Sequence, residues 1–146
     1  SNYQKKVLEI ALLHERIRQR RDDFLHKLSN AIAKRYELVS VEGLNLIEMS
    51  KTNPYYAKQI SRFGWTRFIS FLKYKLEKEG KTLMTMDKWY PSSKLCSHCG
   101  EIHTELKLSN RVFECPSCRL HLDRDHNAAI NINREGLRQY KLAFQL

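Results

Sequence analysis

Two closely spaced pairs of cysteines constrain this chain more than any other feature of its sequence. Cys96 and Cys99 form the first Cys-x-x-Cys pair, and Cys115 and Cys118 form the second. A pair at this spacing can direct both sulfur atoms toward one point about 2.3 Å away, and two pairs complete the tetrahedral shell that Zn²⁺ prefers. Because the interval between the pairs falls within a recognised zinc pattern, the sequence predicts a zinc ribbon that uses all 4 cysteines of the chain.

Other uses of the cysteines fit the sequence less well. A disulfide framework is typical of small secreted domains, and we expect no secretion signal in this chain. A thioredoxin-like redox site would need only one Cys-x-x-Cys pair beside a βαβ unit. Iron could bind the same sulfur atoms, so the pattern predicts the site without fixing the metal. Since a shell of thiolates leaves no open position for water or substrate, the metal is predicted to hold structure rather than to catalyse a reaction.

The charge balance points to a polyanionic partner. The chain carries 26 basic and 16 acidic residues, a formal net charge of +10. Such an excess is typical of nucleic-acid-binding proteins, although it also favours solubility. We find no run of about 18 apolar residues, so we expect no membrane span. Reduced, metal-bound thiols predict a cytoplasmic protein.

The first quarter of the chain is predicted to be one long helix. Residues 3–36 contain no Gly or Pro, and Ile10, Ile17, Phe24 and Ala31 recur at intervals of seven. A helix of that length reaches about 45 Å, so we expect part of it to project or to pack on something outside this domain. A basic cluster lies midway and either contacts phosphates or forms a solvated face: Arg16, Arg18, Arg20 and Arg21.

The middle of the chain predicts a strand, a helix and a second strand. The strands are expected at residues 38–42 and 82–86, with a mobile polar loop at 50–54 and a helix from about 56 to 79. This order favours a right-handed parallel βαβ unit. The helix should bury one apolar face, which consists of Trp65, Phe68, Ile69, Leu72 and Leu76.

The end of the chain predicts an extended stretch followed by a last helix. Residues 120–125 lead into a helix expected at about 126–139. Its predicted apolar face contains small side chains suited to close packing: Ala128, Ala129, Ile132 and Leu137. The whole pattern defines an α/β protein.

Three acidic residues are candidates for chemistry. Glu42 ends the first strand, where open α/β sheets form their sites, and Asp123 and Asp125 precede the last helix. Either aspartate could instead cap that helix, and Asn127 could cap it or orient Asp125. Two acids brought together could hold Mg²⁺, but a metal-dependent phosphodiesterase usually needs three or more oxygen ligands. Spacing alone therefore does not assign a role to these acids.

Three stretches resemble the TnpB family, the OrfB proteins of insertion sequences and relatives of type V CRISPR effectors. Residues 38–45 (LVSVEGLN) resemble the family's second RuvC motif. Residues 90–100 (YPSSKLCSHCG) look like its approach to the zinc ribbon, and residues 123–132 (DRDHNAAINI) look like its third RuvC motif. Because the stretches occur in the family's order and with its approximate spacing, the chain is identified as a member of this family.

The resemblance implies a partial RNase H-like (RuvC) fold with a long amino-terminal helix and an inserted zinc ribbon. It divides the chain into the basic helix and a partial nuclease core at residues 1–93, the ribbon at 94–121, and the last RuvC motif with the final helix at 122–146. By the same resemblance, the complete protein is a bacterial or archaeal nuclease that requires Mg²⁺ and cuts DNA at a site paired to a guide RNA.

The family's pattern also implies roles for the acids. Glu42 would be the second catalytic carboxylate and Asp125 the third, with Asp123 a neighbour. The family's first catalytic Asp lies upstream of the long helix, so we expect this chain to be the carboxy-terminal portion of a longer protein and to be inactive alone. Since the first strands of the sheet would also be absent, we expect two copies to pair over the exposed sheet or the chain to rearrange.

An alternative function needs no catalysis. The chain could be a zinc-ribbon module of transposition that binds DNA or RNA. This reading relies on the net charge, on the arginines of the long helix and on four basic residues around the ribbon: Lys94, Lys107, Arg111 and Arg119. Arg124 either meets the scissile phosphate or faces solvent.

Overall fold

The structure is a computed structural model that describes residues 1–52, 55, 57, 59, 64–107 and 109–145. These residues form two compact units, and each is considered by itself. The first unit contains residues 1–37 and 46–82, and the second contains residues 38–45 and 83–146. None of the helices in the described part of the chain has a stretch long and apolar enough to cross a membrane.

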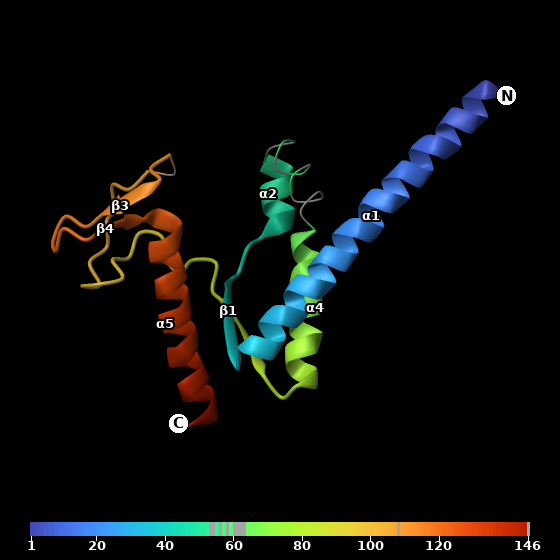
Figure 1. The fold of residues 1–146 in the computed structure, drawn as a ribbon. Helices are drawn as coiled ribbons and strands as arrows, with labels where there is room; N and C mark the ends of the chain where they lie inside the picture. Colours follow the sequence, from blue (N-terminus) through green and yellow to red (C-terminus); the bar gives the residue numbers. More distant parts are fainter. Residues whose placement is uncertain (53–54, 56, 58, 60–63, 108, 146) are drawn as a thin grey trace. The chain divides into compact units, whose positions relative to one another are not determined.

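The first unit is helical. It contains α1 (Asn2–Arg35), α2 (Leu46–Thr52) and α4 (Trp65–Lys78), and α4 lies beside the second half of α1 (Figure 1). α1 confirms the predicted long helix, and Lys34 and Arg35 in its last turn complement the negative end of the helix dipole.

Small residues bring α1 and α4 together. Ser29 and Ala33 on α1, 0% and 1% exposed, leave room for Leu72 and Leu76 of α4. The buried face of α1 is therefore not the predicted series at intervals of seven, since Ile10, Ile17, Phe24 and Ala31 are all exposed. The reason is geometric: burial follows the position of α4 and not the most apolar stripe.

The connection between the first strand and α4 differs from the predicted loop. Residues 50–52 belong to α2, whose Glu48 in the first turn and Lys51 in the last turn both match the helix dipole. The rest of the predicted loop, residues 53–54, lies outside the described residues. The predicted single helix from about residue 56 is interrupted at Gly64, which lies in the left-handed region at φ 63°. Tyr55, Ala57 and Gln59 are helical, and α4 begins after Gly64, at Trp65. Residues 56, 58 and 60–63 also lie outside the described part of the chain.

A two-stranded parallel sheet is formed by β1 (Leu38–Glu42) and β2 (Thr82–Met86). Thr82 N–H donates to the carbonyl of Glu37 just before β1, and Gly43 just after β1 lies against the Met86 carbonyl. The two strands therefore start together and end together, as the predicted βαβ order requires. Their bounds agree with the sequence prediction.

The second unit is built around α5 (Arg124–Phe144), which packs against β1 (Figure 1). A Cβ atom on Gly136 would overlap the Ser40 side chain, so glycine is what lets helix and strand approach this closely. α5 starts two residues earlier than predicted because Asp123 caps it, accepting the His126 N–H at 2.9 Å. One of the two alternatives for Asp123 is thereby confirmed.

The predicted apolar face of α5 is wrong. Ala129 and Leu137 are exposed, and Ala128 and Ile132 are only half-buried. The buried residues of α5 are Asn127, Asn131 and Gly136. The physical reason is that this face of α5 packs on loop backbone, whose polar groups need amide partners rather than methyl groups.

Residues 94–123 form a four-cysteine module. Its strands β3 (Val112–Glu114) and β4 (His121–Asp123) pair antiparallel, with Phe113 opposite Leu122. Phe113 is fully buried against Cys96 and Cys115, with Leu106 and Leu120 packed around them. The module thus has a small apolar core directly under the cysteines.

Candidate functional site

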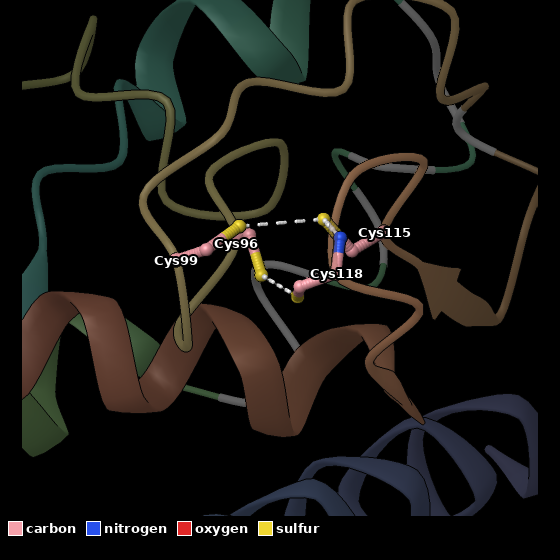
Figure 2. Close-up of side chains that lie close together, drawn as sticks. All are labelled: Cys96, Cys99, Cys115 and Cys118. Carbon is pink, nitrogen blue, oxygen red and sulfur yellow. Dashed lines mark hydrogen bonds between the residues drawn. The ribbon is translucent and has the colours of Figure 1, made fainter.

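The four cysteines converge on one point (Figure 2). All four Sγ atoms lie within 4.8 Å of one another, and the Cys96–Cys118 and Cys99–Cys115 separations are each 3.6 Å. A disulfide would need about 2.05 Å, so these are separate thiols. Sulfur atoms at the corners of a tetrahedron with about 2.3 Å metal bonds are about 3.8 Å apart, and the side chains therefore fit a four-coordinate metal ion.

The two cysteine pairs lie in two separate loops that have the same backbone hydrogen bonds. In both loops the first cysteine donates its N–H to the carbonyl five residues later, and the N–H four residues later donates back to the first cysteine. These bonds are Cys96 to Glu101 at 2.8 Å, Gly100 to Cys96 at 3.0 Å, Cys115 to Leu120 at 2.9 Å, and Arg119 to Cys115 at 3.0 Å. The residue after each pair has a positive φ, 81° at Gly100 and 61° at Arg119.

The electrostatics of the cluster favour a bound cation. Backbone N–H donation from Cys118, opposed by burial and helped by Ser117 N–H, lowers the pKa of the Cys115 thiol to about 7. The pKa of the Cys118 thiol is raised to about 12, because burial and the three neighbouring thiols outweigh N–H donation from Leu120. Thiolates this close repel one another, and a divalent cation removes that repulsion.

Burial divides the cluster into an inner and an outer side. Cys96 is 0% and Cys115 is 3% exposed, whereas Cys99 is exposed and Cys118 is half-buried. The two inner cysteines pack on Phe113, which holds them in place. His98, between the first two cysteines, is exposed and His121 pairs with Glu114 at 3.6 Å, so neither belongs to the cluster.

Both predicted catalytic carboxylates belong to the second unit. Glu42 is exposed at the carboxyl end of β1, and Asp125 is exposed in the first turn of α5. β1 and α5 pack together and run in opposite directions, so the end of β1 and the start of α5 face the same end of this unit (Figure 1). Arg124 lies beside Asp125, with Nη2 3.3 Å from Oδ1.

The predicted nucleic-acid contacts divide between the two units. On α1, Arg16, Arg18 and Arg20 are exposed, and Arg18 pairs with Glu15 at 2.6 Å. Arg21 is half-buried and its side chain lies near Gly64.

In the second unit, Lys94 is exposed and donates to the Thr104 carbonyl at 3.3 Å. The Arg124 side chain is only 15% exposed. The contacts of all these residues with nucleic acid stay a prediction.

Sequence reasoning missed the amides of α5. α5 is capped by Asp123 and not by Asn127, whose side chain turns instead to the first cysteine loop. Asn127 accepts the Ser97 N–H at 2.9 Å and donates to the Leu95 carbonyl at 2.7 Å. Asn131 donates to Leu95 as well, at 2.6 Å. The available signal was the spacing of two asparagines four apart on a face flanked by alanine and isoleucine.

Two family models match this chain. Residues 65–132 match the model described as "Cas12f1-like, TNB domain", and residues 1–53 match the OrfB model described as "Probable transposase". Together they define a protein of the OrfB class of insertion sequences.

Three curated relatives carry consistent names. A Streptomyces pristinaespiralis protein named "Putative RNA-guided DNA endonuclease" is 41% identical over 94% of this chain and 34% of its own length. A TnpB-like protein of Acanthamoeba polyphaga mimivirus is 30% identical over 87% of this chain and 25% of its own length. The Cas12f1 endodeoxyribonuclease of Sulfoacidibacillus thermotolerans is 32% identical over 88% of this chain and 30% of its own length.

The chain belongs to the TnpB family. It spans about a third of the length of the first curated relatives that it matches. The fold is similar to that of Cas12f1 in a cryo-EM structure of a Cas12f1–sgRNA–target DNA complex, with a TM-score of 0.67 and 20% identity over 89% of this chain and 38% of that one.

Proposed function

We propose that this chain is the carboxy-terminal part of an RNA-guided, Mg²⁺-dependent DNA endonuclease, with a RuvC-like nuclease core and a zinc ribbon. The names of the relatives and the likeness to the Cas12f1 fold support this assignment. The observation that carries it is the arrangement of the second unit, in which the strand that ends at Glu42 packs against the helix that begins beside Asp125.

Glu42 and Asp125 would hold Mg²⁺ through their carboxylate oxygens. Bound Mg²⁺ lowers the pKa of a water ligand and stabilises the charge that develops on the attacking and leaving oxygens. Both carboxylates are exposed, so they can reach a nucleic acid backbone. Arg124, whose Nη2 lies 3.3 Å from Asp125 Oδ1, would offset the charge of Asp125 or contact a phosphate beside it. Because a metal-dependent phosphodiesterase usually needs three or more oxygen ligands, these two acids alone are expected to bind Mg²⁺ weakly and not to cut DNA.

Cys96, Cys99, Cys115 and Cys118 would hold one structural Zn²⁺. The support is the fit of four sulfur atoms, all within 4.8 Å, to a tetrahedral shell. Elemental analysis of freshly purified protein is expected to give one zinc per chain. Cys96→Ser should abolish binding, whereas Ser117→Ala, at an exposed position between the cysteines of the second pair, leaves all four ligands in place and should retain the metal. Purified protein without zinc or iron would contradict the site.

The nuclease assignment is tested in the complete protein by guided DNA cleavage. Glu42→Ala and Asp125→Ala are each expected to reduce the cleavage rate by about 100-fold or more, because each removes a metal ligand. Glu77→Ala, which alters a carboxylate exposed on α4 of the other unit, is the matched control and should cut at the parent rate. Undiminished cutting by Glu42→Ala would falsify the assignment.

A second candidate is a zinc module that binds DNA or RNA without catalysis. It is favoured by an open hollow in the four-cysteine module, where Lys107, Arg111 and His121 lie beside Glu105 and Glu114 and could meet a phosphate or a base. This function predicts nucleic-acid binding that weakens with salt and survives loss of both carboxylates.

Association of two copies of the chain stays a prediction, and light scattering at high protein concentration tests it.

A further inference from the structure

Asn127 links α5 to the first cysteine loop by two hydrogen bonds. Its Oδ1 accepts the Ser97 N–H at 2.9 Å, and its Nδ2 donates to the Leu95 carbonyl at 2.7 Å. Asn127 is 0% and Ser97 is 7% exposed, so water does not have free access to replace either hydrogen bond. Because Leu95 and Ser97 flank Cys96, these bonds fix the backbone on both sides of a cluster ligand.

Asn131 and Arg134 extend the same contact along α5. Asn131, 1% exposed, donates from Nδ2 to the carbonyls of Leu95 at 2.6 Å and Ser92 at 2.9 Å. Arg134 donates from Nη1 to the Ser97 carbonyl at 2.9 Å. Residues four and seven positions apart share one helix face, so all three side chains bind the backbone of the first cysteine loop from the same side. We call Asn127, Asn131 and Arg134 the polar clamp.

The second cysteine loop reaches α5 by a different route. The chain leaves Cys118 through β4, which ends at Asp123, and Asp123 caps α5. β3 is paired to β4, and the Arg124 N–H donates to the Arg111 carbonyl at 2.9 Å. One half of the sulfur cluster is thus joined to the start of α5 by the chain itself, and the polar clamp joins the backbone around Cys96 to the same helix.

We propose that the polar clamp couples metal binding at the four cysteines to the order of the first turns of α5, where Asp125 lies. This inference rests on the zinc site proposed above. Metal bound to Cys96 and Cys99 holds residues 92–97 in the shape that pairs Oδ1 and Nδ2 of Asn127 and Nδ2 of Asn131. Without that shape, two buried amides on α5 lose their partners, which is unfavourable. By linkage, the factor by which the clamp raises the affinity of the cysteines for the metal equals the factor by which bound metal raises the equilibrium constant for ordering the first turns of α5.

The clamp residues are positioning residues, and the coupling is measured in the full 146-residue chain. Hydrogen exchange is followed with zinc bound and after chelation. In the parent chain, chelation should speed exchange in residues 124–131 by about tenfold or more. In Asn127→Ala that response should shrink to about twofold, a decoupling that simple loss of stability would not give.

Zinc release to a chromophoric chelator is the second readout. Asn127→Ala and Asn131→Ala should each release zinc about tenfold faster than the parent, since each leaves buried loop groups without a partner. Asn133→Ala is the matched control, because Asn133 is an exposed asparagine on the same helix, and its rate should stay within about twofold of the parent. Arg134→Gln, a milder change, should release zinc about threefold faster and serves if an alanine variant does not fold.

The outcomes separate the two proposals. A parent chain that binds zinc, with Asn127→Ala and Arg134→Gln releasing it no faster than Asn133→Ala, would overturn the clamp and leave the zinc site standing. An unchanged exchange response to chelation in a folded Asn127→Ala chain would overturn it as well. A parent chain that binds no zinc would overturn the zinc site and the coupling together.

Discussion

Gly136→Ala tests whether α5 holds β1, and with it Glu42, at close range. A Cβ atom at this position would lie 2.7 Å from Ser40 Cβ. Carbon atoms pack at about 3.5–4.0 Å, so the helix and the strand must separate by about 1 Å. Overpacking of this kind costs about 1–3 kcal/mol. Because alanine in a helix interior is favoured over glycine by about 1 kcal/mol, we expect a net loss of up to about 2 kcal/mol in the free energy of unfolding.

The assay is urea unfolding of the zinc-loaded chain followed by circular dichroism. Asn133→Ala, on the exposed face of the same helix, is the control and should change the free energy of unfolding by less than about 0.5 kcal/mol. Ser40→Gly should rescue Gly136→Ala: the double variant should lose less free energy of unfolding than the sum of the losses in the two single variants. A Gly136→Ala chain at least as stable as the parent would refute the close approach of α5 and β1.

Two further predictions concern the four-cysteine module. Arg119 lies in the left-handed region of φ, as does Gly100 at the equivalent position of the first cysteine loop. Arg119→Gly should therefore raise the free energy of unfolding by about 1 kcal/mol in the same urea titration. Arg119→Ala is the control and should give no such gain. Phe113 is 0% exposed beneath the cysteines, and Phe113→Ala should lower the stability of the module by about 3–5 kcal/mol in thermal unfolding. Val112→Ala, at a neighbouring position that is 44% exposed, should change it by less than about 1 kcal/mol. Equal losses from both changes would show that Phe113 is not the core of the module.

Local patterns predicted the elements of this fold well. The strands at 38–42 and 82–86 have the predicted bounds, because alternation and the flanking turn residues are local properties. The long α1 was also predictable, since it has no glycine or proline to end it. The short α2 was not, because a polar segment of seven residues carries too little periodicity to distinguish a helix from a loop.

The clustering of the four cysteines was predictable from their spacing alone. Two residues between the cysteines of each pair allow a tight loop, and the loop aims both sulfur atoms at one point whatever surrounds it. The equivalence of the two loops, with Gly100 and Arg119 both at positive φ, was hidden because arginine gives no signal for that conformation. The pairing of Glu42 with Asp125 in one catalytic site stays a prediction that came from the family resemblance.

The sequence by itself determined α1, the strands β1 and β2 and the clustering of the four cysteines, because each depends on neighbours within a few residues. Only the tertiary structure decided which face each long helix buries. On α1 the buried stripe is Leu25, Ser29 and Ala33, where α4 lies, and on α5 it is Asn127, Asn131 and Gly136. A buried asparagine is stable only when distant backbone groups meet its amide, and no local pattern in the sequence specifies which groups those are.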